Sequence, residues 1–243
     1  MSDSLVIIPT YNERENISRM VEVVFGLAQP FHLLIVDDGS PDGTAGLVEE
    51  MQLRYPERLH LLKRAGKLGL GTAYLDGFRW GLARSQGYRY FFEMDADFSH
   101  TPADLIRLRA ACHDGDADVA VGSRYTKGGG VENWPMDRIV LSYGASLYTR
   151  IVTGMPVKDP TAGFMCYTRR VLEAMDFSQI QCIGYAFQIE MKFTARRLGF
   201  RIVEVPITFT DRVAGNSKMH KSIIKEAVLG VARLRWRKDL PPN

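Results

Sequence analysis

The sequence predicts an α/β fold, with a mostly parallel central sheet that carries helices on both faces. Over the first 125 residues, short apolar runs alternate with stretches of helical periodicity, and this alternation is typical of parallel sheets. The composition, 46% hydrophobic and 24% charged, is that of an ordinary globular protein with a substantial core. No internal repeat, low-complexity tract or linker interrupts the 243 residues, so we expect a single domain.

The first half of the chain predicts five strands separated by helical patterns. The strands are expected at residues 5–9, 33–36, 59–62, 88–94 and 119–121. The helices are expected from a charged start at residues 12–16 through Phe25, over residues 70–86 and over residues 102–113. Ser40 and Pro41 follow the second strand, and this pair predicts the N-cap and the first residue of another helix.

The second half of the chain is less regular. Residues 122–137 are rich in glycine and polar groups and predict a long loop, which is often a functional feature. Beyond it we expect helices at 137–152 and 186–198, strands at 163–167 and 201–205, and a closing helical pattern at about 219–236. The simplest division is a domain over residues 1–218 followed by a C-terminal extension over residues 219–243.

The charge balance and the cysteines exclude several classes of protein. Thirty-one Lys and Arg against 28 Asp and Glu give a net charge of +3, too small for a strongly cationic nucleic-acid binder. Cys112, Cys166 and Cys182 lack metal-ligand or redox spacing and suit a reducing compartment. We expect neither a signal peptide nor a membrane-spanning helix, because the best apolar candidate, residues 139–157, is interrupted by polar residues and a proline.

Polar residues follow three of the predicted strands, at residues 9–13, 37–40 and 95–97. Strand-end acids often cap helices or face solvent, but in open α/β sheets ligands bind where the carboxyl ends of the strands converge. Asp95 and Asp97 repel each other unless a cation lies between them, and a hard divalent ion takes oxygen ligands. D-x-D is a common motif by itself; at a strand end it predicts Mg²⁺ or Mn²⁺ bridging a diphosphate.

Glycine-rich motifs narrow the kind of nucleotide site. The chain has neither the G-x-G-x-x-G of dinucleotide-binding folds nor the G-x-x-x-x-G-K-[ST] of P-loop enzymes. Residues 66–71, with the sequence GKLGLG, lead into a predicted helix. Either the backbone and Lys67 approach a phosphate there, or the glycines form a plain left-handed turn, and the sequence leaves both interpretations open.

Eight segments in order carry a family resemblance: IIPTYNERENI, VDDGSPDGT, GLGTAYLDGF, MDADFSH, VGSRY, TAGF, GYAFQIEM and VEVPITF. Together they resemble the family-2 glycosyltransferases of GT-A fold, and more narrowly the polyprenol-phosphate (dolichol-phosphate) mannosyltransferases, over residues 5–220. The resemblance implies a GT-A domain that transfers mannose from GDP-mannose to a polyprenyl or dolichyl monophosphate. It also implies inversion at the anomeric carbon and Mg²⁺ or Mn²⁺ as cofactor.

The same resemblance implies roles for individual residues. Contacts to the nucleoside would come from Pro9, Tyr11, Glu13, Val36 and Asp38. The sugar nucleotide and its metal would be held by Asp95, Ala96 and Asp97, with Asp97 as the direct ligand. Some relatives carry Gln at the position of Ser99, which leaves the third protein ligand open. Phosphates of donor or acceptor would be reached by Arg124, Arg212 and Lys218.

The attacking group determines which residues such a reaction needs. A phosphate monoester is largely ionised near neutral pH, because its second pKa is about 6, so no strong general base is required. The site must instead supply positioning and charge. The expected catalytic residues are therefore Asp97, Arg124, Arg212 and Lys218. Asp159, beside the TAGF segment, is either a sugar contact or a structural cap.

Three other functions stay open on the sequence alone. They are a transferase that uses UDP-glucose with the same lipid acceptor, a transferase that acts on a hydroxyl acceptor, and a nucleotide-sugar-binding protein without activity. The choice of base depends on details around Tyr11 and Asp38 that spacing does not resolve. A hydroxyl acceptor requires a general base, and the Q-x-x-R-W motif of many such enzymes is present only as the fragment Arg235–Trp236.

The C-terminal segment is strongly basic, since residues 212–238 carry eight Lys or Arg and one Glu. An apolar stripe at helical spacing runs through Met219, Ile223, Ala227, Val231 and Leu234. Such a helix lies on an anionic membrane surface, or it packs its stripe against the sheet and leaves the lysines in solvent. We expect a cytoplasmic protein attached peripherally to the cytoplasmic face of a membrane through residues 219–238, with loop 122–137 near the lipid. Nothing in the sequence indicates whether a small membrane partner exists.

Overall fold

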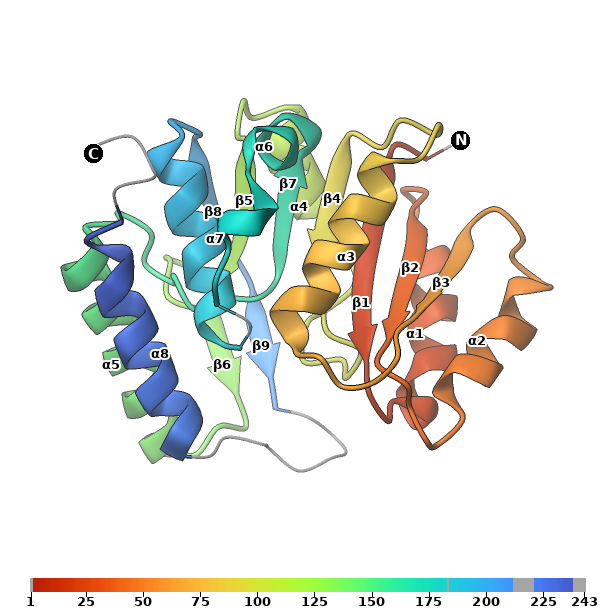
Figure 1. The fold of residues 1–243 in the computed structure, drawn as a ribbon, viewed down its shortest axis with the longest axis horizontal. Helices are drawn as coiled ribbons and strands as arrows, with labels where there is room; N and C mark the ends of the chain where they lie inside the picture. Colours follow the sequence, from red (N-terminus) through yellow and green to blue (C-terminus); the bar gives the residue numbers. More distant parts are fainter. Residues whose placement is uncertain (1, 183, 212–220, 238–243) are drawn as a thin grey trace.

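The computed structural model describes residues 2–182, 184–211 and 221–237 (Figure 1). Within these residues, a central sheet has seven strands in the order β3-β2-β1-β4-β7-β5-β8, and β6 and β9 pair separately. The strands are β1 (Ser4–Thr10), β2 (His32–Asp37), β3 (Leu59–Lys63), β4 (Tyr90–Glu93), β5 (Val119–Ser123), β6 (Gly130–Glu132), β7 (Met165–Thr168), β8 (Ile202–Pro206) and β9 (Thr208–Thr210). Only β7 runs antiparallel to its neighbours in the described sheets, so the predicted mostly parallel sheet is confirmed.

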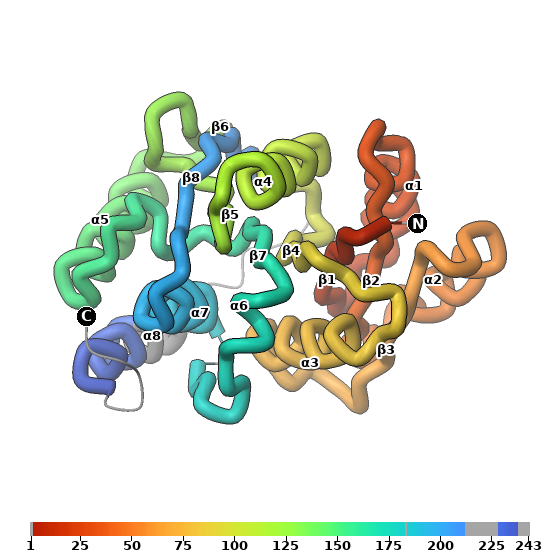
Figure 2. The backbone as a smooth tube through the Cα atoms, turned by 90° about the horizontal axis from the view of Figure 1, so that it is seen from above, coloured from red at the N-terminus to blue at the C-terminus, as the bar shows by residue number. Residues whose placement is uncertain are grey.

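Helices cover both faces of the central sheet, as predicted (Figure 2). The helices are α1 (Arg14–Phe25), α2 (Thr44–Gln52), α3 (Leu70–Leu82), α4 (Asp104–His113), α5 (Met136–Thr153), α6 (Arg169–Ala174), α7 (Ala186–Arg197) and α8 (Lys221–Leu234), with a 3₁₀ turn, η1, at Phe177–Gln179. The core on one face contains side chains from α1, α2 and α4, and the core on the other contains side chains from α3, α6 and α7.

Strand β1 shows why the apolar runs in the sequence are continuous rather than alternating. Val6 and Ile8 point into the core beneath α1 and α4, whereas Leu5 and Ile7 point into the core beneath α3. All four side chains are fully buried. A strand with helices over both faces buries every side chain, so it loses the apolar–polar alternation of a half-exposed strand.

The predicted helix start at Ser40 and Pro41 is wrong, because α2 begins at Thr44. Ser40 Oγ instead donates to Asp37 Oδ2 at 2.5 Å, which ties it to the end of β2. Asp42 takes the capping role, since its Oδ1 accepts from Thr44 N at 2.9 Å. The residue directly before the helix is Gly43, whose φ of 83° suits glycine.

Two further predictions need correction or refinement. Residues 122–137 are not a plain loop, because β6 lies within them and pairs in parallel with β9. Of the predicted stripe, Met219 and the side chains of Ile223 and Ala227 lie outside what the structure describes; Val231 and Leu234 pack inward, as one of the two alternatives held, but on the α5 and α7 layer rather than on the sheet. Val231 and Leu234 are buried with Met155, Ile189 and Phe193 of that layer.

Helices α5 and α8 lie side by side at the end of the molecule opposite α1 and α2 (Figures 1 and 2). Tyr148 Oη donates to Val228 O at 3.0 Å, and Arg235 Nη1 donates to Val152 O at 2.9 Å, so two contacts join the pair directly. Among the described helices, none combines the length and the apolar character that crossing a membrane requires.

Candidate functional site

The carboxyl ends of β1 and β2 are joined by hydrogen bonds between their polar residues. The two strands pair in parallel, with Thr10 opposite Asp37. Thr10 Oγ1 donates to Asp37 Oδ2 at 2.9 Å, and Asn12 N donates to Ser40 Oγ at 3.0 Å. Glu13 N donates to Thr44 Oγ1 at 3.1 Å. Two of the three predicted polar segments therefore form one connected surface at the same edge of the sheet.

Some residues predicted to contact the nucleoside lie on this surface, and others lie buried within the sheet. Val36 is fully buried on β2, directly opposite Pro9 of β1. Glu13 lies at the start of α1, where its Oε2 accepts from Asn16 Nδ2 at 3.0 Å. Ala96, beyond β4, is also buried. The side chains of Val36 and Ala96 therefore belong to the cores on the two faces of the sheet, whereas Glu13 lies at its edge.

Two basic residues belong to this end of the site: Lys67, which the sequence named as a candidate phosphate contact, and Arg64, which it did not single out. Arg64 Nη1 donates to Asp38 Oδ1 at 2.7 Å, and both side chains are at most 9% exposed. Burial raises the pKa of Asp38, and the charge of Arg64 opposes that rise. Lys67 Nζ lies 4.8 Å from the centre of the Tyr11 ring, a cation–π contact. The position of Arg64 directly after β3, the parallel neighbour of β2, is the signal that could have revealed it.

The sequence left open whether the glycines of residues 66–71 form a left-handed turn or bring the backbone and Lys67 near a phosphate. Gly69 precedes the first turn of α3 with a φ of 105° and a ψ of 152°, which suits glycine but is not the left-handed turn that one interpretation expected. Arg64 Nη2 donates to Thr72 Oγ1 at 2.5 Å, and Thr72 Oγ1 donates to Gly69 O at 2.8 Å. These bonds and the bond from Arg64 to Asp38 hold the loop against the end of β2, and Lys67 of the same loop contacts Tyr11.

The acidic pair follows β4 at the same edge, because β4 is parallel to β1. Asp97 is 7% exposed, and its Oδ1 accepts from Ser99 N at 3.0 Å and from Ser99 Oγ at 2.6 Å. Ser99 therefore orients the carboxylate of Asp97. Phe98 between them has a φ of 60°, the left-handed conformation that closes this tight turn.

The donor set at this turn fits a hard divalent cation. Asp95 and Asp97 supply carboxylate oxygens and Ser99 a hydroxyl, which are the ligand types that Mg²⁺ and Mn²⁺ take. The described residues contain no group of three His, Cys, Asp or Glu side chains gathered as metal ligands. A metal held by Asp95 and Asp97 would therefore complete its coordination with water or with oxygens of a substrate.

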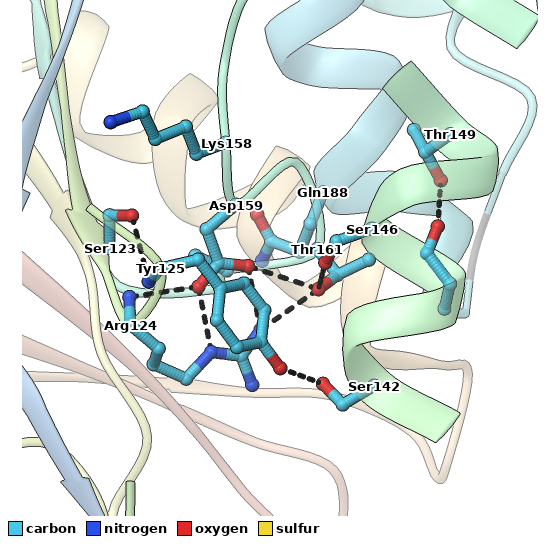
Figure 3. Close-up of polar contacts among 12 residues, drawn as sticks. Ser123, Arg124, Tyr125, Ser142, Ser146, Thr149, Lys158, Asp159, Thr161 and Gln188 are labelled. Atoms are coloured by element: carbon cyan, nitrogen blue, oxygen red, sulfur yellow. Dashed lines mark hydrogen bonds and ion pairs between the residues drawn. The ribbon is translucent and has the colours of Figure 1, made fainter. Parts of the chain in front are cut away.

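Arg124 lies beyond β5, whose carboxyl end reaches the same edge because β4 and β5 both run antiparallel to β7. Figure 3 shows its guanidinium clamped by Asp159: Nε donates to Oδ2 and Nη2 donates to Oδ1, each at 2.7 Å. Nη2 also donates to Thr161 Oγ1 at 2.8 Å. The carboxylate of Asp159 is fully buried and the Arg124 side chain is 10% exposed. Asp159 thus supports Arg124, which favours its structural role over a sugar contact.

The clamp is itself held from a third strand. Glu204 of β8 accepts from Asp159 N at 3.0 Å and from Lys158 N at 2.9 Å. Burial would raise the pKa of Asp159, but the hydrogen bonds and charge of Arg124 outweigh burial and hold that pKa below its ordinary value. The pair is therefore ionised at neutral pH, and the guanidinium keeps its orientation without a ligand.

Aromatic rings surround the guanidinium of Arg124. Its central carbon lies 5.2 Å from the ring centre of Tyr125, 5.6 Å from that of Trp134 and 5.7 Å from that of Phe209. Trp134 lies just before α5, and Phe209 belongs to β9. Arg212 and Lys218, which are predicted to bind phosphate together with Arg124, lie outside the described residues.

A buried polar group lies behind the acidic pair. Glu93 of β4 is completely buried, and burial raises the pKa of its carboxyl to about 8. Lys192 of α7 is equally buried, which lowers the pKa of its ammonium to about 8. Lys192 Nζ donates to Ala162 O at 2.6 Å, in the turn that follows Asp159. Lys192 therefore joins α7 to the segment that follows Asp159, and its charge opposes the rise in the pKa of Glu93.

Comparisons with known proteins identify relatives over nearly the whole chain. The model of the family described as "Glycosyl transferase family 2" matches residues 5–176. The chain is 51% identical over 238 residues to the polyprenol monophosphomannose synthase of Mycolicibacterium smegmatis, covering 97% of this chain and 89% of the relative. It is 46% identical over 236 residues to the undecaprenyl-phosphate mannosyltransferase of Micrococcus luteus, covering 96% and 95%.

Solved structures share the fold at low sequence identity. A mannosyltransferase from Pyrobaculum calidifontis, in complex with GDP-Man and Mn²⁺, aligns with a TM-score of 0.59 at 16% identity, covering 96% of this chain and 69% of that chain. A glucosyl-3-phosphoglycerate synthase from Mycobacterium tuberculosis, in complex with Mn²⁺, UDP and phosphoglyceric acid, aligns with a TM-score of 0.68 at 17% identity, covering 99% and 79%. These likenesses confirm the fold expected of a GT-A glycosyltransferase.

Proposed function

The chain belongs to glycosyl transferase family 2, and from this premise we propose that it transfers mannose from GDP-mannose to a polyprenyl (dolichyl-type) monophosphate, giving polyprenyl β-mannosyl phosphate and GDP. The observation that carries the proposal is the meeting of an acidic pair, Asp95 and Asp97, and a buried arginine, Arg124, at one edge of the sheet. Two close relatives, a polyprenol monophosphomannose synthase and an undecaprenyl-phosphate mannosyltransferase, support the choice of acceptor.

The acidic pair and Arg124 suit the two phosphate groups of this reaction. Asp95 and Asp97 would hold Mg²⁺ or Mn²⁺, which neutralises charge on the departing diphosphate when bound. The guanidinium of Arg124, fixed by Asp159, would orient the attacking lipid phosphate opposite the donor. Because that phosphate is already ionised, the site needs no general base. Arg212 and Lys218, outside the described residues, complete the proposed set of phosphate-binding cations.

The nucleoside would lie along the joined ends of β1 and β2. Tyr11 offers a ring face and Asp38 offers a carboxylate, and the proposed pocket also includes Pro9, Glu13 and Val36. Arg64 holds Asp38 in place and Lys67 covers the ring of Tyr11. A carboxylate held by a buried arginine is suited to a fixed hydrogen bond with a ribose hydroxyl or a base edge.

Residues 219–238 are proposed to attach the protein peripherally to the cytoplasmic face of a membrane, with residues 122–137 near the lipid. The sequence there is strongly basic, and each Lys or Arg near an anionic surface contributes about 1 kcal/mol. Because Val231 and Leu234 are buried, truncation would uncover apolar core. The sharper test is therefore Lys221→Gln with Lys225→Gln, which we expect to weaken binding to anionic vesicles about tenfold or more. Arg54→Gln with Lys63→Gln, at the other end of the molecule, is the matched control.

The transfer reaction is tested with radiolabelled GDP-mannose, polyprenyl phosphate and either Mg²⁺ or Mn²⁺. We expect label in the organic phase, its loss on metal chelation, and its loss in Asp97→Ala. Labelled UDP-glucose in place of GDP-mannose tests the glucosyl alternative, and polyprenol without phosphate tests the hydroxyl-acceptor alternative. Transfer with UDP-glucose but not with GDP-mannose, or to polyprenol but not to polyprenyl phosphate, would refute the mannosyl-phosphate proposal. Undiminished transfer by Asp97→Ala would remove the proposed metal site.

A further inference from the structure

Lys192 of α7 carries a charge that no step of the proposed reaction uses. The side chain is completely buried on the face of the sheet where α7 shares an apolar core with α3 and α6. A buried ammonium requires partners for its N–H groups. Lys192 Nζ donates to Gln188 O of its own helix at 2.9 Å and to Ala162 O at 2.6 Å. The second bond fixes one peptide group outside the helix, the group that joins Ala162 to Gly163.

The N–H of Gly163 is the other polar end of this peptide group. The described peptide bonds are all trans, and in a planar trans peptide the C=O and the N–H point in opposite directions. Because Ala162 O is directed at Lys192, the N–H of Gly163 is directed away from it. Gly163 is only partly buried, and within the part of the chain that the structure describes its N–H donates to no backbone carbonyl. The N–H is therefore open to a ligand.

The sheet topology places Gly163 between the two proposed phosphate sites. Strand β7 begins just after it, at Met165, and runs antiparallel between β4 and β5. The start of β7 therefore lies at the edge where β4 leads into Asp95 and Asp97 and β5 leads into Arg124. The acidic pair would hold the metal with the diphosphate of the donor, and Arg124 the phosphate of the acceptor. A sugar that passes from one to the other crosses the position of Gly163.

The backbone around Gly163 is also held by its neighbours. Phe164 O accepts from Gly122 N, on β5, at 2.8 Å. A methyl group on Gly163 would lie 3.5 Å from Gln188 Nε2, so α7 supports this backbone at ordinary contact distance. A hydrogen bond from an ammonium is stronger than a neutral one and polarises the peptide that accepts it. Lys192 thus fixes the direction of the N–H before a substrate binds, as preorganised donors require.

We propose that the N–H of Gly163 donates a hydrogen bond to an oxygen of the mannose in the bound donor, and that Lys192 is the positioning residue that directs this N–H. The inference rests on the proposed function and adds one contact to the same site. The two phosphate groups are matched by a metal and by Arg124, whereas the sugar between them is uncharged and is suited to a neutral donor. A fixed N–H beside the sugar limits its orientation, so that the anomeric carbon faces the attacking phosphate.

The direct test is amide hydrogen exchange at Gly163 in the full-length wild type, followed by NMR with nitrogen-15-labelled glycine and Mg²⁺ as the metal. The signal of Gly163 is the one that is missing in Gly163→Ala, which we expect to fold because its methyl group makes an ordinary contact. Exchange should slow about fivefold or more with GDP-mannose bound and stay unchanged with GDP bound. Equal protection by the two ligands, or protection by neither, overturns the proposal.

Binding of the same two ligands to variants tests the hydrogen bond itself. Gly163→Pro lacks the N–H, and Gly163→Ala keeps it as the matched control. The quantity measured by titration calorimetry is the Kd for GDP divided by the Kd for GDP-mannose. We expect this ratio to fall about fivefold in Gly163→Pro and to stay near the wild-type value in Gly163→Ala. An unchanged ratio in Gly163→Pro, with thermal unfolding like that of the wild type, contradicts the contact.

The part played by Lys192 is tested with Lys192→Met, which keeps the length of the side chain and removes its donors. The same ratio should fall about threefold or more in this variant. In the double variant with Gly163→Pro, the loss should be close to that of Gly163→Pro alone, because both changes act on one peptide group. A lysine that only stabilises the fold would lower the thermal midpoint and leave the ratio unchanged, and that result refutes the positioning role.

Two outcomes separate this inference from the proposed function. If GDP-mannose protects the N–H of Gly163 but no mannose reaches polyprenyl phosphate, the proposed function fails and the sugar contact stands. If mannose is transferred while exchange at Gly163 is the same with and without GDP-mannose, the function stands and the sugar contact is refuted.

Discussion

Asp159→Asn removes the negative charge that clamps Arg124 and keeps the size of the side chain. In the wild type the carboxylate is fully buried, the guanidinium is 10% exposed, and two hydrogen bonds of 2.7 Å join them. At this depth water screens the pair little, so the variant leaves a buried cation without its counter-charge. Breaking a buried ion pair on one side costs about 3–5 kcal/mol, and we expect that loss in the free energy of unfolding.

The assay is urea denaturation of the wild type, Asp159→Asn, Arg124→Met and the double variant near neutral pH. Because the double variant has neither buried charge, its loss should be at least about 2 kcal/mol smaller than the sum of the two single losses. Kinetics with GDP-mannose are measured in parallel. Unchanged stability together with a raised KM for GDP-mannose would refute the reasoning, because that result identifies Asp159 as a sugar contact instead of the support of Arg124.

The pH dependence of the same variant follows from the direction of the pKa shift. The pKa of Asp159 is lowered from 3.8 by Arg124, so the folded state favours the ionised carboxyl. A lowered pKa contributes stability that is present above the ordinary pKa and is lost as the pH falls through the folded value. The difference in stability between wild type and Asp159→Asn should therefore be constant from neutral pH down to about pH 4 and shrink at lower pH.

Three further outcomes are expected elsewhere in the molecule. Ser99→Ala removes two hydrogen bonds from Asp97, so the Mn²⁺ concentration for half-maximal transfer should rise about fivefold, whereas Ser99→Thr should stay near the wild type. The pKa of Glu93 is raised from 4.5 to about 8, so the folded state of the wild type should lose stability as the pH rises from 4.5 to 8. The free energy of unfolding of Glu93→Gln, measured at several pH values, should not fall over this range for that reason. Gly77→Ala would bring a methyl group within 2.6 Å of Ile7 Cγ2, and thermal unfolding should report a loss of about 1–3 kcal/mol, where an unchanged midpoint contradicts the tight contact.

Local patterns in the sequence predict most of the elements of the sheet but not their directions. Apolar runs locate β1 and β2 within one or two residues of their observed bounds, because a strand buried on both faces is a continuous apolar segment. The antiparallel course of β7 is set by pairing with strands distant in the sequence, which no local pattern encodes. The three-residue strands β6 and β9 are too short to leave a periodic signal.

The candidate site divides in the same way. Asp38, Asp95 and Asp97 were identifiable because each follows an apolar strand, and strand ends share an edge in a parallel sheet. Arg64 was not singled out, and the role of Asp159 stayed open, because their contacts are with residues 26 and 35 positions away in the sequence. A basic residue after a strand is common on any surface, and only burial beside a carboxylate distinguishes one that organises a site.

Helix α5 shows that a correctly predicted helix can still bury a face other than its apolar one. The sequence predicts a helix over nearly the observed residues, and its apolar spacing alone would turn Val140, Leu147 and Ile151 toward the core. The opposite face is buried: Ser146 approaches Thr161 of the Arg124 clamp, and Thr149 satisfies its hydroxyl on Ala145 O within the helix. The packed side of α5 therefore carries small side chains whose hydroxyls are hydrogen-bonded within the helix, and its large apolar residues are exposed.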